Sequence, residues 1–206
     1  MAITNYTELK ASIADWLNRE DLSTQIADFI TLAESSMNDD IRHWRMEKRA
    51  ETTIDGQFTA IPSDWLETIR FHLNASGTVD LRYAPRATVQ HARAATQDAV
   101  GIPDLYTHNA GQFEVYPTPD ASYSADLAYY AKIDALSDSN ADNWLLTNYP
   151  DVYLYGALLH SAPFLKEDER TQTWAALYTS AVKRINKASS KATASGSGLK
   201  MTIRKY

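Results

Sequence analysis

Apolar residues recur at helical spacing near the amino end of the chain. Leu9, Ile13, Trp16 and Leu17 follow the i, i+4, i+7, i+8 pattern of an amphipathic helix. A second stripe begins shortly after Ser23, a residue suited to cap a helix. That stripe comprises Ile26, Phe29, Ile30, Ala33, Met37 and Ile41. The two stripes predict a pair of antiparallel helices joined by a short loop.

From Arg45 onward the hydrophobic period changes to two, which predicts strands. Three turn signals, Asp55–Gly56, the stretch 74–77 and the stretch 109–111, each predict a hairpin. The expected strand pairs are 46–54 with 58–61, 68–73 with 78–83, and 104–108 with 112–116. A last strand over 123–133 is expected to pair with the third hairpin, and the alanine-rich stretch 87–99 predicts a short helix.

Helical periodicity returns in the most apolar stretch of the chain, NWLLTNYPDVYLYGALLH, at residues 143–160. Pro150 suits the first position of a helix that is expected to run to about Leu165, with Pro163 ending or kinking it. A further helix is expected from Glu167 or Asp168 through Lys187. Its apolar stripe comprises Trp174, Leu177, Tyr178, Ala181, Val182 and Ile185.

The apolar stretch at 143–160 could anchor a membrane, hold a cofactor or form a core. A helix needs about 20 apolar residues to cross a bilayer, and Asp151 interrupts the run, so a membrane span is not expected. A wide apolar face with three other amphipathic helices available is typical of a bundle core. The expected core comprises Leu9, Ile13, Trp16, Ile26, Phe29, Ile30, Leu154, Leu158, Trp174, Leu177 and Tyr178.

These patterns together predict an α+β fold. It consists of a four-helix bundle, with two N-terminal and two C-terminal helices, an inserted antiparallel β subdomain and an extended C-terminal tail. The expected boundaries are 1–44 for the N-terminal helical pair, 45–142 for the inserted β-rich subdomain, 143–188 for the C-terminal helical pair and 189–206 for the extended arm. Residues 189–198 carry almost no apolar side chains and are expected to be mobile or extended.

The charge is distributed unevenly. The net charge is -6, but the segment from Arg170 to Tyr206 contains eight Lys or Arg and no Asp or Glu. Such a basic end on an acidic body is typical of a segment that meets an acidic partner; a solvated helix face followed by a disordered end is the alternative. The absence of cysteine excludes disulfides and thiolate sites, and the first ten residues do not predict a signal peptide.

No motif in the sequence predicts catalysis, a metal site or a cofactor. The five histidines never pair at i, i+3 or i+4, and no phosphate-binding glycine loop or nucleophile elbow is present. Paired carboxylates occur at Asp39–Asp40 and across Glu167, Asp168 and Glu169. A glycan hydrolase needs two carboxylates, but most acids of an acidic chain are solvated surface charges. We therefore expect a protein that is not an enzyme.

Several segments carry a resemblance to a known family. They are NYTELKASIADWLNREDL at the amino end, LAYYAKIDALSDSNADNWLL, YPDVYLYGALLHSAPFL, the acidic step KEDER and WAALYTSAVKRI. In these segments the chain resembles the head-to-tail adaptor proteins, also called connector or head-completion proteins, of tailed bacteriophages. The resemblance covers nearly the whole chain and rests on core and turn residues, with no catalytic signature.

The resemblance implies a structural virion protein at the neck, the head-tail junction, which is present in the host cytoplasm during assembly. It implies a homo-oligomeric ring, typically of twelve copies, beneath the portal protein, with the tail or nozzle protein on the opposite side. The genomic DNA would pass through the channel without sequence-specific binding. The C-terminal extension would reach the portal, which makes its end the expected portal-binding segment. That segment comprises Leu199, Lys200, Met201, Ile203, Arg204, Lys205 and Tyr206, with apolar residues in alternation.

Two other functions remain open at this point. A cell-wall (peptidoglycan) hydrolase of the virion would use the carboxylates, and a glycan-binding virion module would use the aromatic residues of the sheet. Neither alternative has a sequence feature of its own.

Overall fold

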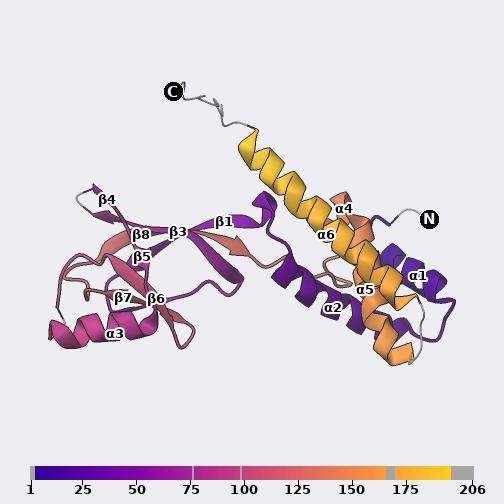
Figure 1. Cartoon of the computed structure of the whole chain (residues 1–206), viewed down its shortest axis with the longest axis horizontal. Coiled ribbons are helices and arrows are strands. Elements are labelled where there is room, and N and C mark those ends of the chain that lie inside the picture. Colours follow the sequence, from indigo (N-terminus) through magenta and orange to yellow (C-terminus); the bar gives the residue numbers. More distant parts are fainter. Residues whose placement is uncertain (1–2, 76, 98, 166–169, 196–206) are drawn as a thin grey trace, which may run out of the picture. The chain divides into compact units, whose positions relative to one another are not determined.

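The computed structural model describes residues 3–75, 77–97, 99–165 and 170–195, and it divides into two compact units (Figure 1). The helical unit comprises Met1–Met46 and Ile133–Tyr206, and the β unit comprises Glu47–Lys132. The described residues form six α-helices and two four-stranded sheets, so the predicted α+β class is confirmed.

The helical unit contains five of the helices. They are α1 (Tyr6–Leu17), α2 (Ser23–Asp40), α4 (Trp144–Asn148), α5 (Pro150–Leu165) and α6 (Thr171–Ala194). The predicted bounds of α5 are confirmed, and Pro163 lies in its last turn. The predicted cap of α2 is wrong by one position, because Ser23 is the first helical residue and Leu22 occupies the cap without a side-chain hydrogen bond.

The apolar helix α5 packs against α1, α2, α4 and α6 (Figure 1). At Gly156 the helix packs closely on α2, since a Cβ there would lie 3.1 Å from the Cβ of Ala33. Most of the expected core residues are buried, but Trp16 is 46% exposed and Leu177 is 37% exposed, so these two predictions are wrong. Both lie at the margin of a helical stripe, where periodicity alone does not separate a buried position from a half-exposed one.

The helix α6 continues to Ala194, seven residues beyond the predicted end at Lys187. The expectation that the chain is mobile or extended from residue 189 is therefore wrong for the stretch 189–194. Ala and Lys are strong helix formers, and the chain has no Gly or Pro between Thr171 and Ser195 to stop a helix already nucleated upstream. Ser189 is also buried, which gives this turn a tertiary contact.

The β unit contains two four-stranded sheets. Sheet A has the order β1 (Glu47–Ile54), β8 (Tyr123–Ala131), β3 (Trp65–Ala75), β4 (Gly77–Asp80). Sheet B has the order β2 (Phe58–Ala60), β7 (Gln112–Tyr116), β6 (Leu105–Asn109), β5 (Arg82–Tyr83). One face of each sheet contributes to a shared core that includes Phe71, Leu127 and Phe113. Helix α3 (Arg86–Ala95) inserts Val89 against Tyr116 and Leu105 of sheet B.

Two of the three predicted hairpins are confirmed, namely β3 with β4 and β6 with β7. The expected strand 78–83 is wrong in its last part, because Arg82–Tyr83 forms β5, which pairs in parallel with β6 of sheet B. The hairpin predicted at Asp55–Gly56 is wrong, because β1 pairs with β8 and β2 pairs with β7. The prediction that the last strand pairs with the third hairpin is also wrong, since β8 lies between β1 and β3. Its apolar residues are buried in the shared core from that central position, a long-range burial that local turn chemistry does not reveal.

Candidate functional site

The segment expected to bind the portal lies outside the described residues. It consists of Leu199, Lys200, Met201, Ile203, Arg204, Lys205 and Tyr206, and the described chain ends at Ser195. What the structure does describe is the helix that carries this segment, together with two polar clusters, one in each unit.

The last third of α6 is attached to the chain that follows α2. The backbone N–H of Trp44 donates to the Oγ of Ser189 over 2.9 Å, and the backbone N–H of Arg42 donates to the Oδ1 of Asn186 over 3.0 Å. The Nδ2 of Asn186 donates in turn to the carbonyl oxygen of Asp40 over 2.9 Å. Three side-chain to backbone hydrogen bonds therefore hold the helix in place close to the start of the C-terminal segment.

The exposed side of the C-terminal half of α6 is basic. The helix contains no Asp or Glu, and Lys183, Lys187 and Lys191 follow one another at a spacing of four residues, all exposed and without an ion pair to any residue that the structure describes. Arg184, in contrast, places its Nη2 2.7 Å from each carboxylate oxygen of Asp151. Like charges at i, i+4 destabilise an isolated helix by about 0.2–0.5 kcal/mol per pair, so this row is not explained by helix stability.

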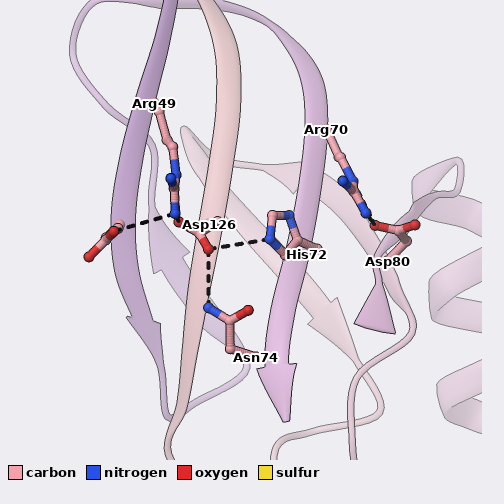
Figure 2. Close-up of polar contacts among 7 residues, drawn as sticks. Arg49, Arg70, His72, Asn74, Asp80 and Asp126 are labelled. Atoms are coloured by element: carbon pink, nitrogen blue, oxygen red, sulfur yellow. Dashed lines mark hydrogen bonds and ion pairs between the residues drawn. The ribbon is translucent and has the colours of Figure 1, made fainter. Parts of the chain in front are cut away.

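A second polar cluster lies on sheet A of the β unit, on the face opposite the apolar core (Figure 2). Its centre is Asp126 on β8, which is 5% exposed. Arg49 on β1 donates to its Oδ1 from both Nε, at 2.8 Å, and Nη2. From β3, the Nδ2 of Asn74 donates to Oδ2 over 3.1 Å, and the Nε2 of His72 lies 3.3 Å from the same oxygen. A single carboxylate thus joins the three strands.

Strand register explains why these side chains meet. Asp126 lies directly opposite Glu51 on β1 and opposite His72 on β3. Diagonal neighbours across a strand pair are within reach of long side chains, and Arg49 is such a neighbour. The guanidinium of Arg49 is the main cause that lowers the pKa of Asp126, followed by the hydrogen bond from Asn74. The carboxylate is therefore ionised, and both of its oxygens contact donor groups. These contacts suit a structural link between strands better than proton donation.

Sequence reasoning did not identify this cluster. The available signal is a single acid, Asp126, within the otherwise apolar and aromatic stretch ADLAYYA at residues 125–131. An acid buried in a sheet needs donors on the adjacent strands. Those donors could be named only once the partners of β8 were known.

The helical unit contains a buried carboxylate of its own. Glu34 on α2 is 6% exposed, and its Oε1 accepts hydrogen bonds from the backbone N–H of Leu136 over 2.8 Å and from the hydroxyl of Tyr153 over 3.2 Å. The Nδ2 of Asn143 donates to the Tyr153 oxygen over 2.7 Å. Burial raises the pKa of Glu34 and also the pKa of the Tyr153 hydroxyl. This node fastens the loop before α4 to the helices α2 and α5.

Of the carboxylates considered for hydrolysis, Asp39 and Asp40 lie within the described residues and both are exposed. The Oδ2 of Asp40 accepts a hydrogen bond from the hydroxyl of Tyr178 over 3.1 Å, and the neighbouring Asp39 is exposed. Glu167, Asp168 and Glu169 lie outside the described residues. Within the described ranges no group of three or more His, Asp or Glu side chains could hold a metal ion.

Two of the histidines contact aromatic or hydroxyl side chains in the helical unit. The Nε2 of His160 lies 3.0 Å from the Oγ of Ser36, and the ring of His43 stacks on that of Trp144 with the ring centroids 5.0 Å apart. Burial lowers the pKa of both imidazoles.

In the part of the chain that the structure describes, no helix is long and apolar enough to cross a membrane.

Comparisons with known proteins support the resemblance found in the sequence. Among curated proteins no match is found. The model of the family described as SU10 adaptor protein matches residues 4–200, a range that contains the β unit, most of the helical unit and the six helices of the described residues. Because this match covers nearly the whole chain, the protein belongs to the SU10 adaptor protein family and is a structural adaptor of a bacteriophage.

Proposed function

We propose that the protein forms a ring, of twelve copies, beneath the portal protein and joins the DNA-filled head to the tail. The family match supports an adaptor role at the virion neck, with the portal protein and a tail or nozzle protein as partners. In this proposal the protein assembles in the host cytoplasm and then becomes part of the neck. The helices α1, α2, α5 and α6 act as a four-helix bundle that carries the inserted β subdomain.

The C-terminal residues are the proposed anchor on the portal. The single observation that supports this most is the course of α6: it continues to Ala194, acid-free, and hydrogen bonds from the backbone of Arg42 and Trp44 hold its last third. A held helix followed by a short segment of alternating apolar and basic residues is suited to fold on a partner. Lys200, Arg204 and Lys205 would attract an acidic portal surface in a salt-dependent way.

The channel of the ring is proposed to let genomic DNA pass without sequence-specific binding. Upstream of Arg170 the chain has 12 Lys or Arg and 26 Asp or Glu, so the body is acidic. An acidic body does not retain a polyanion through phosphate contacts, which are the main source of non-specific DNA affinity. The proposed role is structural and requires no catalysis; a zymogram with peptidoglycan that shows clearing by the purified protein would contradict it.

Deletion of Gly198 to Tyr206 tests the proposed anchor. We expect the truncated protein to unfold at the same temperature as the full chain, because the deleted residues follow the last described turn of α6. We expect it to be lost from a pull-down with the portal protein of the same phage. The control is the full chain with Lys183, Lys187 and Lys191 changed to Gln, which alters the charge of α6 and keeps the tail. A truncated protein that still fills its place on DNA-packed heads at normal occupancy would overturn the anchor.

A further inference from the structure

Strand β1 has a free backbone edge. It is the terminal strand of sheet A, and all eight of its residues pair with β8. Within the described ranges, no backbone–backbone hydrogen bond joins residues 49–54 to another segment on the other side of the strand. Along these residues the edge presents N–H and C=O groups that can pair with an added strand.

An open apolar cavity of about 200 Å³ borders the same edge. Ala50, Glu51 and Thr52 of β1 line it, together with Ala60, Ile61 and the core residues Phe71 and Leu127. In strand addition, backbone hydrogen bonds supply affinity and pockets for alternate side chains supply specificity. Strand β1 combines both features within a few residues.

Charged residues on β1 offer a different explanation, since natural edge strands are often protected by charge. Lys48 points to the core side of the strand and is paired with Asp64, with Nζ 2.8 Å from Oδ2. This ion pair places charge at the start of the edge, which disfavours strand addition at that point. It does not account for the apolar cavity further along at Ala50 and Thr52, where the core-side residues are small and uncharged.

We infer that the edge of β1 accepts, as an added strand, the C-terminal segment Leu199–Tyr206 of a second copy of this chain. Leu199, Met201 and Ile203 would face the cavity, because they alternate as β1 residues do. Lys200 and Arg204 would then lie on the outer face, where β1 carries Glu47 and Glu51 on either side of Arg49, whose guanidinium is paired with Asp126. The match is therefore clearest on the cavity side, where apolar residues of the segment would meet the apolar residues that line the cavity.

The segment matches β1 in length, since each comprises eight residues. Eleven residues follow Ser195, and an extended chain spans about 3.3–3.6 Å per residue. Each copy supplies one such segment and one edge, so the same head-to-tail contact can repeat from copy to copy and close a ring. This inference rests on the proposed ring, and it places the segment on a neighbouring copy until the portal displaces it.

Disulfide trapping tests the contact cleanly, because the chain contains no cysteine. Full-length Thr53→Cys, on the outer face of β1, is mixed with full-length Thr202→Cys under mild oxidation without portal. A disulfide forms only where Cα atoms approach to about 4.4–6.8 Å, so Glu51→Cys is tested in parallel to allow for the strand register. We expect a disulfide-linked pair to form at least about tenfold faster than with a control cysteine, because docking raises the local thiol concentration.

The control cysteine is Thr78→Cys, at the opposite edge of the same sheet. Thr53 pairs with Ser124, Ser124 with Asn74, and Asn74 with Thr78, so the two threonines lie in one row across sheet A. Both are exposed. Equal rates at the two edges would overturn the inference. So would a disulfide that forms only within one chain, in the variant that carries both Thr53→Cys and Thr202→Cys.

A second substitution tests the apolar side of the contact without altering the folded units. Met201→Asp in the Thr202→Cys chain would place a charge against the cavity, and we expect the rate to fall to that of the Thr78→Cys control. Ser197→Asp adds the same charge outside the alternating segment and should leave the rate unchanged. A Met201→Asp chain that cross-links normally would overturn the inference.

The two experiments distinguish the edge contact from the portal anchor. If cross-linking fails while portal attachment still needs the tail, only the edge contact is wrong. If cross-linking succeeds and the truncated chain still attaches to the portal, only the portal anchor is wrong.

Discussion

The backbone N–H of Trp44 donates a hydrogen bond to the Oγ of Ser189 over 2.9 Å. These residues are 145 positions apart in the sequence, and their contact joins the segment after α2 to α6 within the helical unit. Ser189 is 7% exposed, although it begins the stretch that the sequence assigned to an extended linker. The buried hydroxyl shows that this part of α6 belongs to the folded unit.

Ser189→Ala should therefore destabilise the helical unit. The change leaves the Trp44 N–H without its partner, and loss of a partly buried hydrogen bond costs about 1–3 kcal/mol in the free energy of unfolding. The matched control is Ser190→Ala, because Ser190 is exposed and donates to the Asn186 carbonyl of its own helix. Urea denaturation of both variants checks the prediction, and equal stabilities would show that the Trp44 contact contributes nothing.

Helices were easier to predict than strand partners, and the reason is physical. Helical hydrogen bonds are local, so the apolar periodicity around Pro150 was enough to predict the bounds of α5. Strand partners, in contrast, can be far apart in the chain. Asp126 on β8 pairs with Glu51 on β1 and with His72 on β3, and each of these partners precedes it by more than 50 positions. Turn signals such as Asp55–Gly56 mark where the chain bends without specifying its new partner.

The site was predictable only in part for the same reason. The basic, acid-free character of α6 and of the segment after it is visible in the sequence, because charge counting needs no contacts. The cluster around Asp126 and the node around Glu34 depend on side chains brought together from different elements. A buried acid can be suspected from an apolar neighbourhood, but its donors follow from tertiary structure.

Trp174→Ala should destabilise the fold strongly. The indole is 2% exposed, and truncation of a buried Trp to Ala costs about 3–5 kcal/mol, because it removes apolar contacts and leaves a cavity. The control is Leu177→Ala, three residues further along the same helix, where the side chain is 37% exposed and the expected loss is about 1 kcal/mol or less. Chemical denaturation measures both values. Similar losses for the two variants would mean that the packing face of α6 is misassigned.

Glu34→Gln should gain stability relative to the wild-type protein as the pH rises from 4 to 7. Burial raises the folded-state pKa of Glu34, so between the unfolded-state value of about 4.3 and the folded-state value the folded protein binds more protons. Wild-type stability therefore falls as the pH rises through this window, by about 1.4 kcal/mol for each unit of pKa shift. Gln keeps a carbonyl oxygen that can accept from Leu136 and has no carboxyl group to ionise.

Urea denaturation at several pH values gives the difference between Glu34→Gln and wild type. The control is Glu20→Gln, which makes the same substitution at an exposed glutamate of the same unit. If the difference for Glu34→Gln does not vary from pH 4 to 7, Glu34 binds protons alike in the folded and unfolded states, and its surroundings do not disfavour the charge.

Asp126→Asn should weaken the β unit at neutral pH and remove part of its acid sensitivity. Arg49 is the main cause of the lowered pKa of Asp126, so the ionised carboxylate contributes stability that is fully present above the unfolded-state pKa of about 3.9. That contribution is lost as the pH falls through the lower folded-state pKa. The unfolding temperatures of the variant and the wild type should therefore differ at pH 7 and converge as the pH approaches 2.

Asp80→Asn is the control, since Asp80 pairs with Arg70 at a side-chain exposure of 60% and an exposed pair contributes little to stability. If the Asp126→Asn protein melts like the Asp80→Asn protein at every pH, the stability of β1, β8 and β3 does not depend on the contacts of Asp126.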